Sequence, residues 1–96
     1  MDHPGMEYKF TARVWYSEWY FVSLPQQLSA EIRGNPQHLE EGWGRLKITA
    51  KIGGTEWRTA IWFDTKRQTY LLPIKGEIRK KEKIGAEQEV TVTLWI

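Results

Sequence analysis

Few residues in this sequence have the types and spacing that catalysis needs. The two histidines, His3 and His38, stand far apart, and the chain has no cysteine. Metal sites and nucleophilic cysteines need such groups at defined spacings, so we expect no metal site and no cofactor. His38 with Glu40-Glu41 could form an acid–base site, but a polar triplet of this kind is more typical of a solvated loop.

Two glycine-containing segments could be mistaken for phosphate-binding loops. Gly42-Trp43-Gly44 and Gly53-Gly54 lack the neighbouring Lys or Ser and the strand-to-helix setting of such loops, so both predict turns. Asp64 fits a turn-initiating position better than a catalytic one. The sequence therefore predicts a domain that is not an enzyme.

Aromatic side chains offer a different chemistry, that of binding. On three expected strands the alternation groups a tryptophan with polar residues: these are Trp15, Trp43 and Trp95. Indole rings beside Arg or Lys can stack bases, sugars or cationic groups. They can also pack beneath a helix, which we favour for Trp15 and Trp95 because both lie near strand ends. Trp43, beside a polar loop, is the strongest candidate for a functional aromatic residue.

Basic residues are concentrated in one segment. Residues 66–83 contain seven basic and two acidic residues, a net charge of +5, whereas the rest of the chain carries −3. This asymmetry could attract an anionic ligand or nucleic acid, although a solvated lysine-rich helix has the same composition. The candidate ligand-binding residues are Trp43, Arg45, Trp57, Trp62, Tyr70, Arg79, Lys80 and Lys81.

The elements that must position these residues are mostly strands. Alternation of apolar and polar residues predicts strands over 8–16, 19–24, 43–52, 55–63, 68–72 and 89–96. The first two are expected to pair as a hairpin. Short helices are expected over 25–33, where Pro25 suits a first turn and Leu28 and Ile32 share a face, and over 75–81. Residues 34–42 read as a mobile polar loop and residues 1–6 as a disordered tail.

The two halves of the chain repeat one pattern. A strand ending in Leu24-Pro25 precedes a helix with Glu31-Ile32-Arg33, and a strand ending in Leu72-Pro73 precedes a helix with Glu77-Ile78-Arg79. The sequence therefore predicts a mainly β fold: a small split, pseudo-twofold β-barrel of about six strands capped by two short helices.

Length and composition indicate one domain over residues 1–96. We find no signal peptide and no apolar run long enough to span a membrane, so we expect a cytoplasmic protein with no membrane partner. We expect a monomer or a weak homodimer.

Several segments together resemble a prokaryotic family known only as domain of unknown function nineteen-oh-five. They run over 21–25, 52–59, 70–75, 78–80 and 90–94, with Trp43 between them. The resemblance covers residues 8–96 and implies a helix-capped split barrel in which a strand-Pro-helix-strand unit occurs twice. Members are often found alone or beside a domain associated with bacteriocin protection, and none has established catalytic residues. Relatives tend to have Gly-Asp where this chain has Glu87-Gln88, which implies a different turn that uses Gly85.

The second half also resembles, more distantly, the swapped-hairpin DNA-binding domains of transition-state regulators and antitoxins. Pro73, Ile78-Arg79 and the strand over 90–94 fit that pattern. Those relatives build one barrel from two chains, whereas this chain holds both halves, which argues against a DNA-reading dimer.

Two classes of function remain open at this point. The preferred one is a non-enzymatic binding or accessory domain that acts through the Trp43 edge and the basic helix around Arg79, with nucleic acid as one possible ligand. The alternative is a small-molecule-binding or enzymatic barrel. Its pocket would be lined by Trp43, Trp57, Trp62 and Tyr70, with Glu41 or Asp64 as the acid.

Overall fold

The structure, a computed structural model, describes residues 3 and 5–96, and all of their side chains except that of Trp43. The strands are β1 (Glu7–Arg13), β2 (Trp15–Tyr16), β3 (Tyr20–Ser23), β4 (Arg45–Ile52), β5 (Thr55–Asp64), β6 (Thr69–Pro73) and β7 (Glu89–Trp95). The helices are α1 (Gln26–Arg33), the short 3-10 turn η1 (Gly42–Gly44) and α2 (Gly76–Glu82). The chain is therefore mainly β with two short helices, as the sequence predicted.

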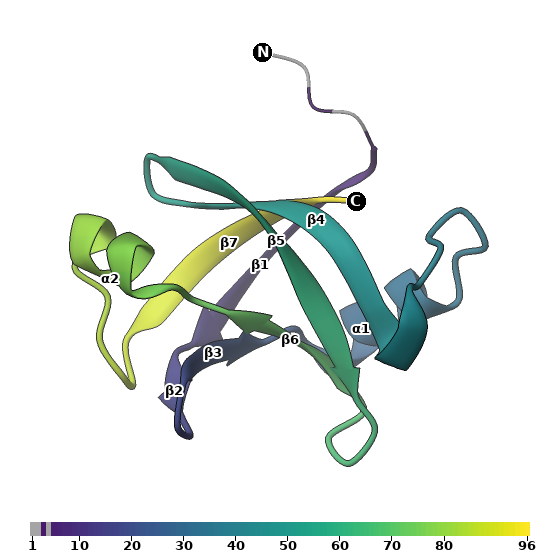
Figure 1. Cartoon of the computed structure of the whole chain (residues 1–96), viewed down its shortest axis with the longest axis horizontal. Coiled ribbons are helices and arrows are strands. Elements are labelled where there is room, and N and C mark those ends of the chain that lie inside the picture. The colour runs from purple at the N-terminus through teal and green to yellow at the C-terminus, as the bar shows by residue number, and fades with distance from the viewer. Residues whose placement is uncertain (1–2, 4) are drawn as a thin grey trace.

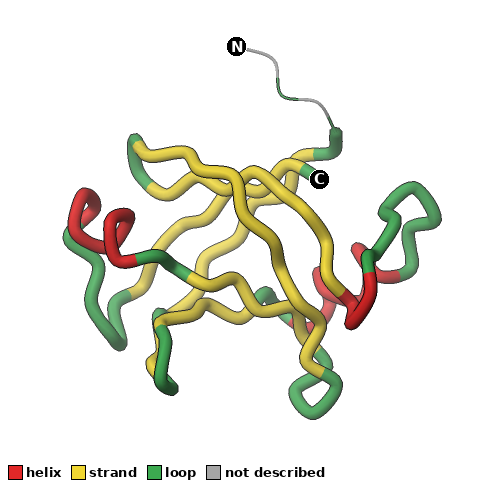
Figure 2. The backbone as a smooth tube through the Cα atoms, viewed as in Figure 1, coloured by secondary structure: helices red, strands yellow, loops and turns green. Residues whose placement is uncertain are grey.

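All the strands belong to one antiparallel sheet in the order β1-β7-β4-β5-β6-β3-β2. The sheet curls into a half-barrel, and α1 and α2 lie on opposite sides of it (Figures 1 and 2). The two outermost strands of the sheet, β1 and β2, are consecutive in the chain and are separated only by Val14. One run of chain therefore supplies both edges of the curled sheet.

Val14 is where the first predicted strand breaks. Its side chain is fully buried, its N–H donates to the Gln88 carbonyl, and its own carbonyl accepts from the Glu87 N–H, both bonds belonging to the β1–β7 side. Beyond Val14 the chain leaves β7 and pairs with β3 instead. The prediction of one continuous strand over 8–16 is therefore wrong, and the predicted hairpin is confirmed only for β2 and β3. The alternation is lost at the bend, so Tyr16 is exposed.

The core is formed by the inward faces of the long strands. On β4 the predicted inward residues Leu46, Ile48, Ala50 and Ile52 are all buried. On β7 the residues Val90, Val92 and Leu94 are buried in the same way. Each large apolar side chain removed from water stabilises the fold by about 1.5–3 kcal/mol, so the curl of the sheet follows from the need to enclose these faces.

The helices begin and end for local reasons. Pro25 precedes α1 and its carbonyl accepts the Ser29 N–H, and the Gly34 N–H donates to Ala30 at the other end. Helix α2 ends at Lys83, whose φ of 54° lies in the left-handed region. Each helix buries an isoleucine against the sheet, Ile32 in α1 and Ile78 in α2. Both helices thus lie close to their predicted ranges.

The hydrogen bonds also relate the two halves, but in a register two residues away from the Leu24-Pro25 and Leu72-Pro73 match of the sequence. Strands β3 and β6 pair with each other, and the Leu24 N–H donates to the Tyr70 carbonyl at 2.9 Å. In return the Ile74 N–H donates to the Tyr20 carbonyl at 2.9 Å. Exchange of β3 with β6 therefore maps Tyr20 onto Tyr70 and Leu24 onto Ile74. In the same exchange α1 corresponds to α2, because each helix follows its strand.

Two turns differ from the simple expectation. Strand β4 begins at Arg45 rather than at Trp43, because Gly42–Gly44 forms η1 and Gly44 adopts a φ of 68°. Before β7, the Gly85 carbonyl accepts the Gln88 N–H and Glu87 adopts a φ of 70°. The chain thus makes the turn over Gly85–Gln88 with a glutamate in a conformation that glycine adopts more easily.

Candidate functional site

An open groove of about 890 Å³ lies along the outer face of β4 and β5. Its walls come from both strands, from the residue before α2 and from the end of β7. None of the described residues that line it is acidic. These residues are Gly5, Arg45, Lys47, Ile48, Thr49, Arg58, Thr59, Ala60, Trp62, Lys75, Trp95 and Ile96.

Strand alternation and register bring the groove together. Successive side chains of a strand point to opposite faces, so the inward apolar residues of β4 leave Arg45 and Lys47 on the outer face. The register then sets Trp62 of β5 opposite Arg45. It sets Ala60 opposite Lys47, where its small side chain is only 2% exposed. We attribute the hollow between the larger side chains to this alanine.

Two tryptophans line the groove on either side of β4. Trp62 is 38% exposed and pairs across β5–β6 with Leu71. Trp95 pairs across β4–β7 with Thr49 and donates its indole N–H to Glu7 at 3.1 Å. The imidazole of His3 stacks on Trp95, with 3.7 Å between ring centroids and 8° between ring planes. The outer face of Trp95 therefore accepts a planar ring.

The positive charges of the groove are only partly neutralised. Glu41 lies 3.3 Å from Lys47 Nζ and forms a second salt bridge with Arg45. These hydrogen bonds, first to Lys47 and then to Arg45, lower the pKa of Glu41. Within the described part of the chain, Arg58 and Lys75 form no salt bridge, and both are exposed. These two cations are the most available for an anionic ligand.

The groove contains only some of the candidate residues named from the sequence. Arg45 and Trp62 lie in it as a cross-strand pair, whereas Trp57 and Tyr70 are buried in the core. The prediction of an aromatic pocket lined jointly by Trp57, Trp62 and Tyr70 is therefore wrong. Trp57 and Trp62 are five residues apart on one strand, and an odd spacing places them on opposite faces.

The predicted residues of helix α2 lie outside the groove. The Arg79 guanidinium lies 3.8 Å from the centroid of the Tyr20 ring, and its Nε donates to the Ile74 carbonyl at 3.2 Å. Lys80 and Lys81 are exposed on α2. The Trp43 side chain, the strongest sequence candidate, lies outside the described residues. Four residues of the groove were not among the candidates from the sequence: Lys47, Arg58, Lys75 and Trp95. The alternation of side chains along β4 and β5 could have assigned Lys47 and Arg58 to the outer face.

The other two predicted wet-face tryptophans are half-buried by local partners. Trp15 stacks on Phe21 at 4.8 Å between centroids, donates to Ser23 Oγ at 3.0 Å, and has the Arg67 guanidinium 4.7 Å from its ring centroid. Trp95 is covered by His3 as described above. Both rings are packed, but their partners are side chains of β3, of the turn before β6 and of the segment at the start of β1, rather than the helix that the sequence predicted.

The polar loop between α1 and η1 holds the His38-Glu40-Glu41 triplet, and each member has a partner. His38 Nε2 lies 2.8 Å from the Tyr8 hydroxyl, and burial lowers the pKa of His38. The Tyr70 hydroxyl donates to Glu40, and burial followed by this bond raises the pKa of Tyr70 far above its usual range. Glu41 belongs to the groove edge. The triplet therefore does not form one acid–base site.

Asp64 has the role of a turn residue. Its Oδ1 accepts the Lys66 N–H at 2.9 Å and its Oδ2 accepts from the Arg67 guanidinium at 2.6 Å. The Arg67 hydrogen bond is the main cause of the lowered pKa of Asp64. This geometry confirms the turn interpretation of Asp64.

A smaller hollow of about 560 Å³ lies beside α1. Arg33 covers the ring of Phe63 there, with its guanidinium 3.8 Å from the ring centroid.

Across the residues that the structure describes, no group of three or more His, Asp or Glu side chains could hold a metal ion. Nor does any helix among these residues have the length and apolar character that would cross a membrane.

Comparison with known proteins identifies the family. The chain belongs to the family described as domain of unknown function DUF1905, whose sequence pattern matches residues 10–94. No curated protein matches the chain. The family assignment agrees with the resemblance seen in the sequence and leaves the function open.

Proposed function

We propose that this domain is a non-enzymatic binding domain whose ligand is anionic and lies in the groove on the outer face of β4 and β5. One observation carries the proposal: the groove brings four cationic side chains together, with no acidic residue among its described lining. A concave surface of one charge sign concentrates counter-charged ligands and accelerates their association.

The chemistry of the lining supports binding over catalysis. Its polar side chains are those of Arg, Lys, Thr and Trp. Such a lining offers hydrogen-bond donors to an anion, but its two threonine hydroxyls have no carboxylate or imidazole beside them in the described lining to act as a general base. The groove thus has what recognition of an anion requires.

The position of the groove supports the same conclusion. It extends from Arg45, which follows η1, to Lys75, which precedes α2. The Trp43 edge and the basic helix, the two regions that the sequence suggested, therefore lie at the ends of one surface. The exposed Lys80 and Lys81 add positive charge on the α2 side.

Charge reversal in the groove tests the proposal. Inorganic polyphosphate is the probe, and its affinity is measured by calorimetry over a range of salt concentrations. We expect the logarithm of the binding constant to fall linearly with the logarithm of the salt concentration. We expect the double variant Arg58→Glu, Lys75→Glu to bind polyphosphate about ten-fold or more weakly than wild type.

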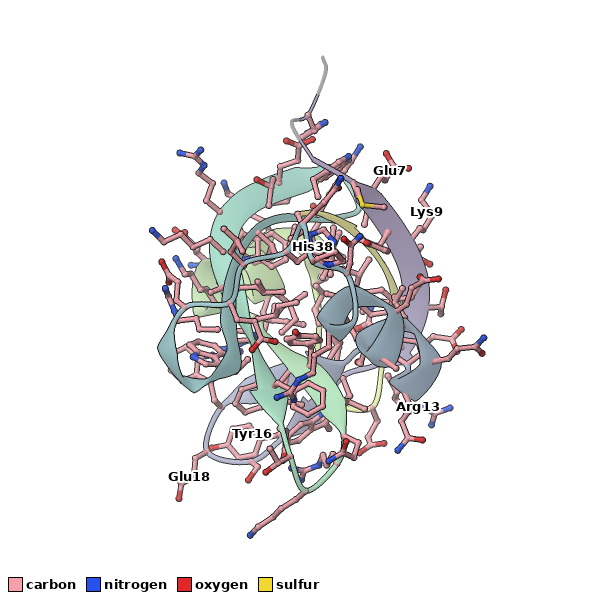
Figure 3. The ribbon with its side chains drawn as sticks, turned by 90° about the vertical axis from the view of Figure 1, so that its right-hand side faces the viewer. Glu7, Lys9, Arg13, Tyr16, Glu18 and His38 are labelled. Atoms are coloured by element: carbon pink, nitrogen blue, oxygen red, sulfur yellow. The ribbon has the colours of Figure 1, made fainter. Side chains whose placement is uncertain are left out.

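The matched control is Lys9→Glu with Arg13→Glu. It makes the same change in net charge on β1, where both side chains project outward and neither lines the groove (Figure 3). The control is expected to bind polyphosphate with a much smaller loss. Equal losses in the two double variants, or no binding of wild type at low salt, would show that the groove is not an anion site.

A further inference from the structure

We infer that the anionic ligand of the groove is single-stranded nucleic acid, held by stacking of bases on Trp62 and Trp95 and by phosphate contacts from the cations around them. This inference rests on the proposed function, because it names the ligand class of the same site. It depends on the aromatic residues of the groove, whereas the proposed function depends on its charges.

The first argument is the position of Trp62. It stands on the outer face of β5 between Arg45 of β4 and Leu71 of β6, so a neighbouring strand lies on each side of it. The ring is 38% exposed. An indole in this setting is an exposed apolar surface beside a cation. Single-strand binders use the same combination, because every base has a face that can stack and every nucleotide carries a phosphate.

The second argument is the ring already stacked on Trp95. The His3 imidazole lies nearly parallel to the indole, and His3 Nε2 lies 3.0 Å from Glu56 Oε1. His3 belongs to no strand, whereas Trp95 is held in β7 by its pairing with β1 and β4. A base that replaced His3 would make the same planar contact. The groove thus has two stacking positions, one of them occupied by the protein's own side chain.

The third argument is spacing. Trp62 and Trp95 pair with Arg45 and Thr49 of β4, so they are offset by four residues, or about 13 Å, along that strand. They also flank β4 on its two sides, which adds about 10 Å across the sheet. This separation suits a short stretch of nucleotides whose two end bases stack and whose phosphates pass Lys47 and Arg58.

A duplex would use this surface poorly. Its bases are stacked on each other, so Trp62 could not reach a base face without unstacking it. Duplex readers place a helix or a two-stranded ribbon in the major groove, whereas this surface is concave. A polyanion without bases would contact the cations but not the indoles. Dependence of binding on Trp62 therefore distinguishes a single strand from a duplex and from a polyanion without bases.

The experiment measures the affinities of three probes for wild type and for variants of Trp62. The probes are a fluorescein-labelled oligothymidine of ten nucleotides, its duplex with oligoadenosine, and inorganic polyphosphate. We expect wild type to bind the single strand at least about ten-fold more tightly than the duplex. We expect Trp62→Leu to weaken single-strand binding by about ten-fold and to leave polyphosphate binding within about two-fold of wild type.

Two further variants make this result specific. Trp62→Phe retains an aromatic face, so we expect it to bind the single strand with most of the wild-type affinity. Comparison of Trp62→Phe with Trp62→Leu therefore shows whether binding needs an aromatic ring at this position. Trp19→Leu removes an indole that is 48% exposed on the β2–β3 hairpin, outside the groove, and is expected to change nothing. Far-UV circular dichroism checks that each variant is folded.

The outcomes separate the inference from the proposed function. If polyphosphate binding depends on Arg58 and Lys75 but oligothymidine binding does not change in Trp62→Leu, the groove is an anion site and the inference is wrong. Equal or tighter binding of the duplex also overturns the inference. If wild type binds none of the three probes at low salt, both the inference and the proposed function are wrong.

Discussion

Two tyrosines at equivalent positions of the repeated strand–helix unit have opposite surroundings. Tyr70 of β6 is fully buried, its N–H donates to Ser29 Oγ of α1 at 3.0 Å, and its hydroxyl donates to Glu40. Tyr20 of β3 is only half-buried, its ring lies against Arg79 of α2 and it contacts the exposed Tyr16. The same topology thus encloses one tyrosine and leaves the other partly open.

This difference between the two tyrosines follows from what helices α1 and α2 contact. Helix α1 and the loop after it close over the core, through a buried serine and a hydrogen bond to Glu40. Helix α2 instead presents Arg79, Lys80 and Lys81, and it begins beside the groove at Lys75. We propose that the α1 side contributes more to the stability of the fold than the α2 side, whose Lys80 and Lys81 are exposed.

Truncation of the two tyrosines tests this proposal with the largest expected effect. Tyr70→Ala removes a fully buried ring, so we expect it to lower the free energy of unfolding by about 3–5 kcal/mol. Tyr20→Ala removes a half-exposed ring, and we expect a loss of about 1–2 kcal/mol. Urea unfolding followed by fluorescence measures both values.

Tyr70→Ala could unfold a domain of this size, because small domains have only about 5–15 kcal/mol of stability in total. Tyr70→Phe therefore serves as a milder version: it keeps the ring, removes only the bond to Glu40, and should cost about 1 kcal/mol. Similar losses in Tyr70→Ala and Tyr20→Ala would contradict the proposed difference between the two sides.

Substitution of the helix residues that contact the two tyrosines should give a smaller difference in the free energy of unfolding. Ser29→Ala leaves the buried Tyr70 N–H without its acceptor, and we expect a cost of about 1–3 kcal/mol. Arg79→Ala removes a cation from a partly exposed ring, and we expect about 0.5–1 kcal/mol. Hydrogen exchange of the Tyr70 amide should accelerate in Ser29→Ala and remain unchanged in Arg79→Ala. A larger loss of stability in Arg79→Ala than in Ser29→Ala would reverse the comparison.

The smallest expected effect is a pH dependence on the α1 side. Burial lowers the pKa of His38 below its usual value of 6.5. The unfolded chain therefore binds a proton at a higher pH than the folded chain does, and the free energy of unfolding falls as the pH is lowered through about 6.5 toward the folded pKa. Above this window His38 is neutral in both states and contributes no pH dependence.

Urea unfolding at a series of pH values from 8 to 5 measures this dependence. His38→Gln keeps a side chain that can bond the Tyr8 hydroxyl but cannot titrate, so its profile should be flatter than that of wild type. An unchanged slope in His38→Gln would show that the loop histidine does not contribute.

Much of the fold could be predicted because local patterns decide it. The inward residues of β4 and β7, the helix start after Pro25 and the turn at Asp64 all follow from alternation or from the chemistry of one residue. The break at Val14 could not be predicted, because Tyr8 to Tyr16 alternates without interruption. What ends the first strand is the partner strand: β7 accepts the chain up to Val14, and β3 pairs with it beyond.

The candidate site was predictable only in part for the same reason. Parity already separates Trp57 from Trp62, and it assigns Arg45, Lys47 and Arg58 to the outer face. Parity cannot say which strands are neighbours, so the sequence did not show that Lys75 and Trp95 would join the same groove. The residues next to Tyr70 in the sequence do not predict that it is buried, because its partners Ser29 and Glu40 are 41 and 30 residues away.

The sequence by itself determined most of the strands, the two helices and the faces on which basic and apolar residues lie, because each depends on interactions between residues close in the chain. Only the tertiary structure decided that β4 and β5 would align Arg45 with Trp62, that Ala60 would leave a hollow between them, and that one tyrosine of the repeat would be enclosed. These features depend on the register between strands and on contacts between distant segments. Such contacts form only when the whole sheet curls to bury its inner face.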